Sequence, residues 1–560
     1  MKKIEPRFIA GPPGTGKTHG EDIKENWGIV GLYKELLLKY HPDKIILLSH
    51  TNVAADQIKD AILELPIMKE RGFTKKSMKY KICTIHSYCK NRLLKKEKFE
   101  YEDHKNLIIQ NRLFGRDSSG DVDKHALYKF RSDAKGRGYK RYDEYWRICD
   151  KFAYRPYRIE LIKELLPIYE KYKKDNNKCD YTDMIEDFIK QTYNEKTKKM
   201  EDDVRDPDID AVIIDECQDS NVPQTKAIEK MATNVKEGHY YLVGDADQTL
   251  FEYAGSDADK YHKLAAHPYK ELKEGLRCSE AINKKCREII MPIWNHYGSH
   301  RTWTPAKYTE KHNMGHIGEI IKGNSYYLSN LEGSGHLDIL LDKIKNTNQT
   351  FLFTYRGTPG DTRCRKFFDY HGLEYAHVSN TAHVSKKEIR AHHVWPEFIK
   401  GKPVSLTQVR NFWDYMGSKV IVRGKKDPKV FEGWLKEDYT IDTLISKGLL
   451  KAECKQYTDF DLVRVPSKTT KENLLYIKKI IAKGFDYDKK IQIKYGNIHQ
   501  VKGLTFDNVI VDHTVTRHEK WFTQLRLAYT AYSRGIFDCW SLQTQRKLTL
   551  GRKNENQSIR

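Results

Sequence analysis

A glycine-rich segment near the start of the sequence restricts the fold more than any other feature. The residues GPPGTGKT at 11–18 follow a short apolar run, RFIA, and match the pattern G-x-x-x-x-G-K-[ST]. Such a segment joins a strand to a helix, and the residues THGEDIKENW at its end fit a helix. Its glycines allow backbone N–H groups to surround phosphates, so the pattern predicts a nucleotide-binding loop.

The residues of this loop have separate expected roles. The Lys17 ammonium group is expected to reach the outer phosphates, and the Thr18 hydroxyl is expected to bind Mg²⁺. The expected nucleotide-binding residues are Gly11, Pro12, Pro13, Gly14, Thr15, Gly16, Lys17 and Thr18. Many classes of protein share this loop, so the loop alone does not define a reaction.

The segment AVIIDECQDS at 211–220 narrows the class of protein. Its β-branched run is typical of a buried parallel strand, which would deliver Asp215 to the magnesium ion at the carboxyl end of the strand. The adjacent Glu216 is placed to polarise an attacking water, so the pair indicates hydrolysis. The alternative is an ordinary strand end with solvated acids, and the upstream phosphate loop weakens that alternative.

The charge balance favours a polyanionic partner. The 560 residues include 99 Lys and Arg against 77 Asp and Glu, a net charge of +22. A generally lysine-rich soluble protein would also carry such a charge, but the 35 tyrosines favour nucleic acid, because aromatic rings stack on bases. The ten cysteines form no C-x-x-C pair, and no apolar run approaches the roughly 20 residues of a membrane span. These features predict a cytoplasmic protein with reduced thiols and no membrane partner.

Nine segments carry recognisable motifs. In order, they are LLSHTNVAADQI (47–58), TIHSY (84–88), DYTDMI (180–185), DECQDS (215–220), VGDADQTLFEYAG (243–255), GLRCS (275–279), FTYRG (353–357), GNIHQVKGLTFDNVIV (496–511) and LRLAYTAYSRG (525–535). Together they resemble the UvrD/Rep/PcrA family of superfamily 1 helicases. The resemblance implies an α/β fold of two RecA-like P-loop motor domains, with parallel sheets flanked by helices. Each motor domain would carry an inserted, mainly helical accessory domain.

The segment DADQTLFEYAG at 245–255 places polar groups suited to phosphates close to two aromatic rings. The resemblance implies that Gln248 contacts the γ-phosphate or its attacking water. It also implies that Tyr253, at the position of the family's tryptophan, stacks on a base of single-stranded DNA and that Phe251 supports this platform. The alternative is that both rings pack at a strand end. On the first interpretation, one short segment links ATP to DNA.

The resemblance assigns further charged residues to the nucleotide. Arg277 and Arg534, both from the second motor domain, would offset the negative charge on the γ-phosphate, and Arg356 is a weaker candidate. An isolated arginine is most often a solvated surface cation, so these roles depend on the motifs. The expected catalytic set is Lys17, Asp215, Glu216, Gln248, Arg277 and Arg534. The expected DNA contacts are His50, Thr51, Asn52, Thr84, His86, Phe251, Tyr253, Arg356 and His499.

The gaps between the motifs predict four domains. They are residues 1–87 with 179–270 (first motor domain), 88–178 (its insertion), 271–356 with 495–560 (second motor domain) and 357–494 (its insertion). In the first insertion, KGRGYKRYDEYWR at 135–147 suits either the clasping of nucleic acid or a solvated helix whose rings pack inward. In the second, the basic segment IVRGKKDPK at 421–429 suits duplex phosphates.

These observations predict an ATP- and Mg²⁺-dependent DNA helicase that moves 3′ to 5′ along single-stranded DNA. Its expected partners are single-stranded DNA and junctions of single- and double-stranded DNA in replication, repair or recombination. A nucleotide-switched DNA-binding protein that displaces other proteins without unwinding is an alternative, and an RNA-directed motor is another. The short lysine- and tyrosine-rich chain suits the cytoplasm of a bacterial or phage-infected cell.

The departures from the family's pattern fall at the base end of the nucleotide site. Only ten residues precede Gly11, so the upstream glutamine segment that reads adenine in the family is not expected in this sequence. Leu276 replaces the tyrosine that stacks on the base, and Thr505 replaces the glutamate of K-G-L-E-F. The phosphate end of the site is therefore complete, while the base end is not.

We expect weak discrimination among nucleoside triphosphates, because a pocket without polar partners imposes no penalty on the wrong base. GTP or a pyrimidine triphosphate should support DNA-stimulated hydrolysis within about tenfold of ATP, a gap of about 1.4 kcal/mol or less. Steady-state specificity constants for the four ribonucleotides measure this gap. An ATP preference of several hundredfold would show that another residue, such as Arg7, Phe8 or His19, supplies the base contact.

Overall fold

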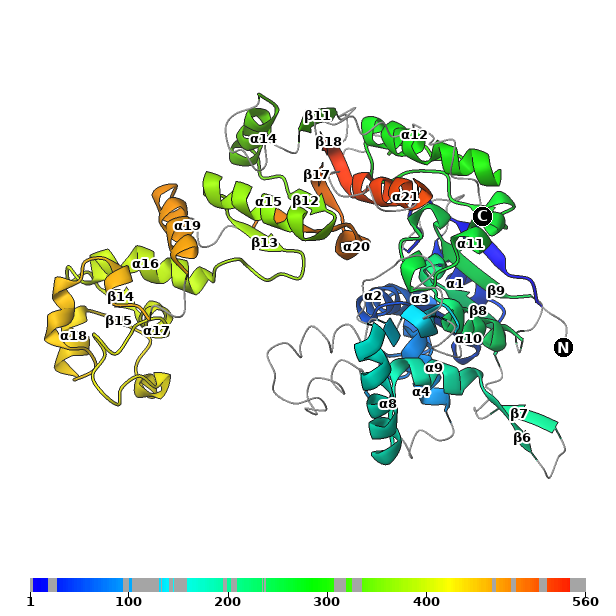
Figure 1. Cartoon of the computed structure of the whole chain (residues 1–560), viewed down its shortest axis with the longest axis horizontal. Helices are drawn as coiled ribbons and strands as arrows, with labels where there is room; N and C mark the ends of the chain where they lie inside the picture. The colour runs from blue at the N-terminus through cyan, green and yellow to red at the C-terminus, as the bar shows by residue number, and fades with distance from the viewer. Residues whose placement is uncertain are drawn as a thin grey trace. The chain divides into compact units, whose positions relative to one another are not determined.

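The chain forms two compact units, each built on one parallel sheet. The computed structural model describes residues 4–18, 28–93, 100–102, 130–131, 133–139, 145, 159–194, 199–202, 209–233, 235, 238–306, 319–324, 335–465, 470–484, 490–512 and 521–543. The units are Met1–Ile317 with Lys520–Ser533, and Gly318–Glu519 with Arg534–Arg560. Helices flank both sheets (Figure 1). This confirms the α/β fold class expected for two RecA-like domains.

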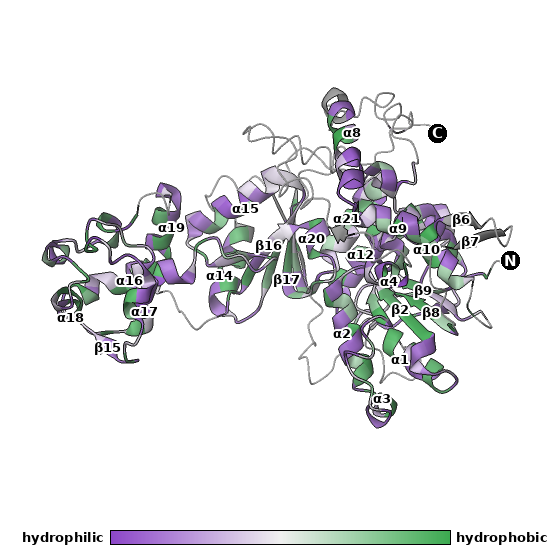
Figure 2. Ribbon diagram, turned by 90° about the horizontal axis from the view of Figure 1, so that it is seen from below, coloured by the Kyte–Doolittle hydropathy of each residue, from purple (hydrophilic) through white to green (hydrophobic). Residues whose placement is uncertain are grey.

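The sheet of the first unit has six parallel strands in the order β10-β1-β9-β8-β2-β3. They are β1 (Arg7–Ala10), β2 (Ile45–Ser49), β3 (Ile82–Thr84), β8 (Ala211–Ile214), β9 (Tyr240–Gly244) and β10 (Lys270–Glu271). The central strands β8 and β9 are continuous apolar runs, coloured green in Figure 2. Strands of this composition fit a parallel sheet, because helices bury both of its faces.

Helices cover both faces of this sheet. One face packs against α4 (Ile85–Arg92), α9 (Tyr181–Ile189), α10 (Val222–Ala232) and α11 (Ala258–Ala266), and the other against α1 (Ile29–Leu37), α2 (Asn52–Leu63) and α3 (Pro66–Glu70). Ile46 and Leu48 of β2 belong to the first core, while Ile45 and Leu47 belong to the second, as strand alternation requires. The helix expected directly after the phosphate loop falls on residues 19–27, which lie outside the described residues.

Two further helices belong to the first unit. They are α12 (Glu280–Tyr297) and α21 (Trp521–Tyr532), and they pack against each other (Figure 1). A small antiparallel pair, β6 (Gln191–Asn194) and β7 (Lys199–Asp202), also lies in this unit.

Buried ion pairs hold the described part of the first insertion on the motor domain. Its elements are β4 (Glu100–Glu102) and α8 (Ile159–Asp175), and β4 pairs with β5 (Lys178–Asp180). Arg131 contacts Asp180 at 2.6 Å and Asp183 at 2.5 Å, and Lys173 contacts Asp183 at 2.6 Å. Asp180 also begins α9 with a reciprocal capping box. The segment DYTDMI therefore joins the insertion to the motor domain.

Part of the basic and aromatic segment 135–147 packs inward, whereas Arg137 is exposed. Lys135 lies 2.8 Å from a carboxylate oxygen of Glu186, and Tyr145 is buried with its ring 5.2 Å from Phe130 and 5.4 Å from Tyr139. These contacts support the alternative of a helix with inward-packing rings. Residues 140–144 and 146–147 of the segment lie outside the described residues.

The sheet of the second unit is also parallel, in the order β11-β18-β17-β12-β16-β13. Its strands are β11 (Ile320–Asn324), β12 (Phe351–Tyr355), β13 (Tyr375–His377), β16 (Ile493–Asn497), β17 (Phe506–Asp512) and β18 (Gly535–Gln543). Its core packs against α14 (Gly335–Asn346), α15 (Gly357–His371) and α19 (Lys471–Ala482).

A mainly helical group with its own core lies in the second insertion. Its elements are α16 (Lys386–Phe398), β14 (Val404–Ser405), α17 (Leu406–Trp413), β15 (Asp438–Tyr439) and α18 (Ile441–Ser446). Trp395, Phe412, Trp413 and Phe431 are central residues of its core. Because this core is separate from that of the sheet, the group is an accessory module in the second unit.

The expected domain boundaries differ from the packing in three segments of the chain. Residues 271–306 and 521–533 pack with the first unit, although the sequence analysis assigned them to the second motor domain. Strand β13 belongs to the second sheet and helix α15 packs in its core, although both fall in the expected insertion 357–494. The four-domain division remains a proposal.

Most of the cysteines that the structure describes are buried. The nine cysteines that the structure describes are free thiols, and all except Cys179 are buried. Within the described part of the chain, every helix is too short or too polar to traverse a lipid bilayer.

Candidate nucleotide site

The loops that carry the motifs of the first unit leave its sheet at one edge. In the strand pairing, Ala10 lies opposite Gly244, and Leu48 lies opposite both Ile214 and Cys83. Because the strands are parallel, the segments that follow them gather at the carboxyl edge, where open α/β sheets bind ligands.

Hydrogen bonds within the phosphate loop and to the end of β9 fix its conformation. The Gly11 N–H donates to the Gly244 carbonyl at 3.0 Å, and the Lys17 Nζ donates to the Gly11 carbonyl at 2.8 Å. Gly14 and Gly16 have φ angles of 71° and 77°, in a region that favours glycine. Of the other loop residues, Pro12, Pro13 and Thr15 are buried and Thr18 is partly exposed. A turn of this kind can surround an anion with N–H groups.

Asp215 directly follows β8 and is buried beside the Ser49 hydroxyl group. Its Oδ2 accepts a hydrogen bond from the Ser49 hydroxyl at 3.3 Å. Burial raises the pKa of Asp215 to about 7, and the neighbouring Glu216 carboxylate raises this pKa as well. Carboxylate and hydroxyl oxygens are the ligands that Mg²⁺ takes in proteins, so Asp215 and Thr18 fit a magnesium site.

Glu216 has an unusual backbone conformation. Its φ and ψ of 49° and 39° are left-handed, which costs a non-glycine residue about 1–3 kcal/mol. Its Oε1 lies 4.0 Å from the Lys17 Nζ, and its Oε2 accepts a hydrogen bond from Gln218 Nε2 at 2.5 Å. The structure thus brings together Lys17 and Glu216, two residues that the sequence analysis selected from different motifs.

Gln248 is buried in the short helix η3 (Ala246–Gln248), beneath the exposed part of its loop. Its Nε2 donates to Asp245 Oδ2 at 2.8 Å. The Asp245 carboxylate also accepts from Arg301 Nη1 and from the Tyr529 hydroxyl, each at 3.1 Å. Arg301 contacts the Asp247 carboxylate as well, so one buried cation holds both aspartates of the loop.

Tyr253 lies in the next short helix, η4 (Glu252–Ala254), with 41% of its surface exposed. The Phe251 ring is tilted against it, with the centroids 6.1 Å apart. Arg137 of the first insertion donates to the Tyr253 carbonyl from Nε at 3.1 Å and Nη2 at 2.9 Å. Arg526 donates to the Glu252 carboxylate at 2.7 Å. An exposed ring on a backbone held from two sides is suited to stacking on a base.

The expected arginine Arg277 lies beside the phosphate loop. A Cβ built on Gly14 would lie 2.7 Å from the Arg277 Cβ, and the Leu276 N–H donates to the Gly14 carbonyl at 2.7 Å. Residue 276, where the family has its base-stacking tyrosine, therefore adjoins the loop. Both residues belong to the first unit, in contrast to the domain expected for Arg277.

The expected DNA contacts of the first unit lie just beyond the carboxyl ends of β2 and β3. His50 follows β2, and its Nε2 is 3.2 Å from the Ser220 hydroxyl. Thr51 and Thr84 cap α2 and α4. Asn52 is exposed, and His86 is partly buried, which lowers its pKa. The structure describes all five residues. His50 is one position past the end of β2, and Thr84 is the last residue of β3.

The remaining expected residues lie in the second unit: Arg356 and His499 follow the carboxyl ends of β12 and β16, whereas Arg534 directly precedes β18. Arg356 directly follows β12 and contacts His499 Nε2. Burial lowers the pKa of His499 to about 4, and the charge of Arg356 contributes. Arg534 is buried, and its Nη1 donates to the Leu504 carbonyl at 3.5 Å.

The structure shows site residues that the sequence analysis did not select. Gln218 and Arg301 contact the acids of the motifs directly, as described above. Gln218 stands inside DECQDS, so its motif was a signal, whereas no motif marks Arg301. Of the residues considered for a base contact, Phe8 is buried in the core, and the Arg7 guanidinium lies over the rings of Tyr241 and Tyr269 at 5.6 and 5.1 Å. His19 lies outside the described residues.

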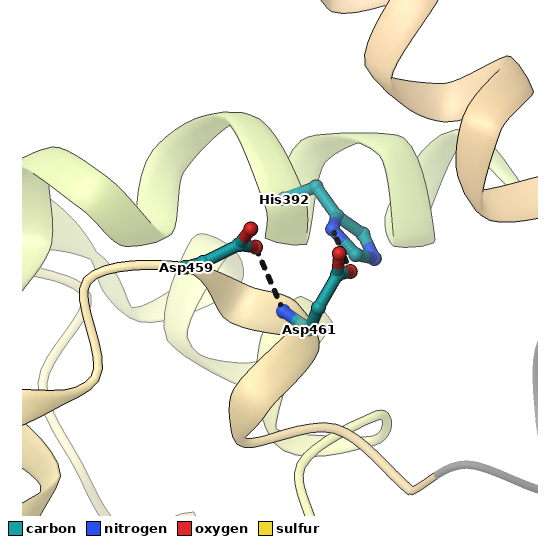
Figure 3. A group of neighbouring side chains, drawn as sticks. All are labelled: His392, Asp459 and Asp461. Atoms are coloured by element: carbon teal, nitrogen blue, oxygen red, sulfur yellow. Dashed lines mark hydrogen bonds and ion pairs between the residues drawn. The ribbon is translucent and has the colours of Figure 1, made fainter.

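A second group of titratable side chains lies in the helical insertion (Figure 3). His392 of α16 points towards Asp461, with its Nδ1 3.4 Å from Asp461 Oδ1. Lys478 of α19 lies 3.1 Å from Asp459 and 2.7 Å from Asp461. Because Lys478 forms ion pairs with both acids, we interpret the group as an ion-pair cluster that joins α16 to α19. Burial lowers the pKa of His392 to about 4.

Comparisons with known proteins find similarity to helicases. Residues 3–268 match the family model of the UvrD/REP helicase N-terminal domain. A "Probable DNA helicase II homolog" of Mycoplasma pneumoniae is 25% identical over 371 residues, which cover 61% of this chain and 47% of that protein. An equally named protein of Mycoplasma capricolum is 27% identical over 274 residues, 45% of this chain and 34% of that protein. The "ATP-dependent DNA helicase Rep" of Buchnera aphidicola is 29% identical over 106 residues, 19% of this chain and 15% of that protein. The match spans less than half the length of each of these relatives.

We expect magnesium-dependent ATP affinity to rise with pH through about 7, because a protonated Asp215 cannot bind the ion. The Ser49 hydroxyl favours the charged form of Asp215, so Ser49→Ala should move this rise to higher pH. At pH 6 the variant should bind roughly two- to fivefold more weakly, the value of about one hydrogen bond. The measurement is the ATP dissociation constant from pH 6 to 8.5, with excess EDTA as the metal-free control. Coincident profiles for the two proteins would contradict the assignment.

Proposed function

We propose that this chain, a UvrD-like helicase of superfamily 1, hydrolyses ATP to move 3′ to 5′ along single-stranded DNA and to separate the duplex ahead of it. One observation carries the proposal. The loop 245–255 contains a buried Gln248, bonded to Asp245 at the end of β9, and, five residues later, an exposed Tyr253. A segment of this kind can pass a change at the phosphates to a base.

The residues at the carboxyl edge of the first sheet are proposed to perform the hydrolysis. Lys17 and the loop backbone would bind the phosphates, and Glu216 would orient and deprotonate the attacking water. Asp215 and Thr18 would hold a magnesium ion, which neutralises phosphate charge when bound. Arg277 is the candidate in the first unit for offsetting charge on the γ-phosphate, and Arg534 is the candidate in the second unit.

A track for single-stranded DNA is proposed along the same edge. His50, Thr51 and Asn52 follow β2, Thr84 and His86 lie at the end of β3, and Phe251 with Tyr253 forms a stacking platform. In the second unit, Arg356 and His499 follow β12 and β16. The net charge of +22 favours the polyanion. DNA junctions in cytoplasmic replication, repair or recombination are the proposed substrates.

Two other functions make different predictions. A nucleotide-switched protein that displaces other proteins would show DNA-stimulated ATPase without strand separation, and an RNA-directed motor would respond more strongly to RNA than to DNA of the same sequence. The deciding experiment is unwinding of matched 3′- and 5′-tailed duplexes with ATP. We expect unwinding of the 3′-tailed duplex only, and no unwinding of either would exclude the helicase function.

Separate losses of binding and turnover are expected in the nucleotide site. Lys17→Ala should abolish phosphate anchoring, whereas Glu216→Gln should retain ATP binding and lose turnover by roughly 10²- to 10⁴-fold, because only the water-activating carboxylate is removed. ATP dissociation constants and kcat measure the two effects. Glu229→Gln on α10, whose carboxylate is paired with Lys260 at 2.8 Å, is the matched control. Near-normal turnover in Glu216→Gln would contradict the assignment of the base.

Removal of the proposed stacking ring should affect DNA and spare ATP. Tyr253→Ala should cost roughly 1–3 kcal/mol of base stacking and reduce unwinding, while ATP affinity stays unchanged. Fluorescence titration with single-stranded DNA and with ATP measures both. Tyr80→Ala is the control, because Tyr80 is similarly exposed at 38% but precedes β3, at the opposite end of that strand from Thr84. Loss of ATP binding with normal unwinding would show that the Tyr253 ring is structural.

A further inference from the structure

Gln218 connects two motifs of the nucleotide site through its side-chain amide. The residue is buried in the short helix η2 (Cys217–Asp219). Its Nε2 donates to Glu216 Oε2 at 2.5 Å, and its Oε1 accepts from the Asp245 N–H at 3.2 Å. Both ends of the amide are therefore used, and they contact segments that follow neighbouring strands, β8 and β9.

Gly244, the residue before Asp245, leaves room for the Gln218 side chain. A Cβ built on Gly244 would lie 2.1 Å from Gln218 Oε1 and 3.0 Å from the Cys217 sulfur. Only a glycine leaves enough room for the amide to reach the backbone at the end of β9. The approach of Gln218 to Asp245 is thus fixed by packing as well as by the hydrogen bond.

Asp245 extends the connection to Gln248. Its N–H contacts Gln218, while its carboxylate accepts from Gln248 Nε2 at 2.8 Å and from Arg301 at 3.1 Å. The path from the Glu216 carboxylate to Gln248 therefore consists of three consecutive hydrogen bonds. All of its members except Glu216 are buried, so water does not compete for these bonds.

Glu216 needs such support because its backbone is strained. A left-handed glutamate persists only where its surroundings determine its conformation. Among the described hydrogen bonds, the one from the Gln218 amide is the shortest that the Glu216 carboxylate accepts. An amide can both donate to the carboxylate and accept from the Asp245 backbone. Neither a carboxylate nor an apolar side chain at position 218 can do both.

We propose that Gln218 is a positioning residue that holds the Glu216 carboxylate for water activation and ties it to the loop of Gln248 and Tyr253. The inference rests on the proposed role of Glu216 in hydrolysis. A group that orients a general base affects turnover more than substrate binding, because its contribution is made in the transition state. Since the same loop carries Tyr253, the connection also supports stimulation of turnover by DNA.

The test is Gln218→Met, which keeps the volume and removes both hydrogen bonds. We expect kcat to fall roughly 10- to 100-fold, the range for a misplaced catalytic group, with the KM for ATP within about twofold. The ratio of DNA-stimulated to basal turnover should also fall. Gln218→Glu retains an acceptor but sets a carboxylate against Glu216, so it should be at least as impaired. The assays are steady-state ATPase with and without single-stranded DNA, ATP binding and thermal unfolding.

The matched control is Gln224→Met, the same substitution at a buried glutamine that caps α10 in the same unit. A normal kcat in Gln218→Met would overturn the inference. An equal loss in both variants, together with an equal fall in unfolding temperature, would also overturn it by showing a merely structural effect. If Gln218→Met is normal while Glu216→Gln is inactive, the proposed function stands without the positioning role. If Glu216→Gln is active, the proposed function itself fails.

Discussion

The register of the parallel strands in the first sheet determines where every part of the candidate site can lie. Ala10 is paired with Gly244, and the Gly11 N–H is bonded to the Gly244 carbonyl at 3.0 Å, so the phosphate loop and the loop 245–255 start from the same level. A shift of one residue would turn the apolar set of a strand to the other face. Because cores cover both faces, the register is strongly specified, and so are the positions of Asp215 and Glu216.

The loop 245–255 depends in turn on charges that water does not reach. Asp245, Asp247 and Arg301 are buried, and the Trp294 Nε1 of α12 donates to Asp247 at 2.8 Å. Moving such charges out of water costs several kcal/mol per ion, so the ion pairs are weak evidence for stability. Their geometry indicates that these ion pairs position the loop rather than stabilise the fold. Together with the hydrogen bonds from Trp294 of α12 and Tyr529 of α21, they fix the position of η3 and of Gln248.

Local patterns were sufficient to predict the strands and the motif residues, because a buried parallel strand and a phosphate loop each have a short sequence signature. The contacts of Gln218 and Arg301 were not predictable in this way. Arg301 lies 54 residues from Asp247, and no local pattern indicates that pairing. The boundaries of the insertions were equally obscure, because α15 and β13 resemble any helix and strand until their packing on the second sheet is known. Arg277 was assigned to the second motor domain by resemblance, whereas its position against Gly14 is a matter of packing.

The support of Tyr253 explains how an exposed ring can serve as a firm platform. Arg137 of the first insertion holds its carbonyl, and Arg526 and Thr523 of α21 hold the adjacent Glu252 carboxylate at 2.7 and 2.9 Å. The backbone of η4 is therefore ordered before any ligand binds. Since ordering a side chain or loop on binding costs about 0.5–1.5 kcal/mol for each immobilised group, a platform ordered in advance keeps more of the stacking energy as affinity.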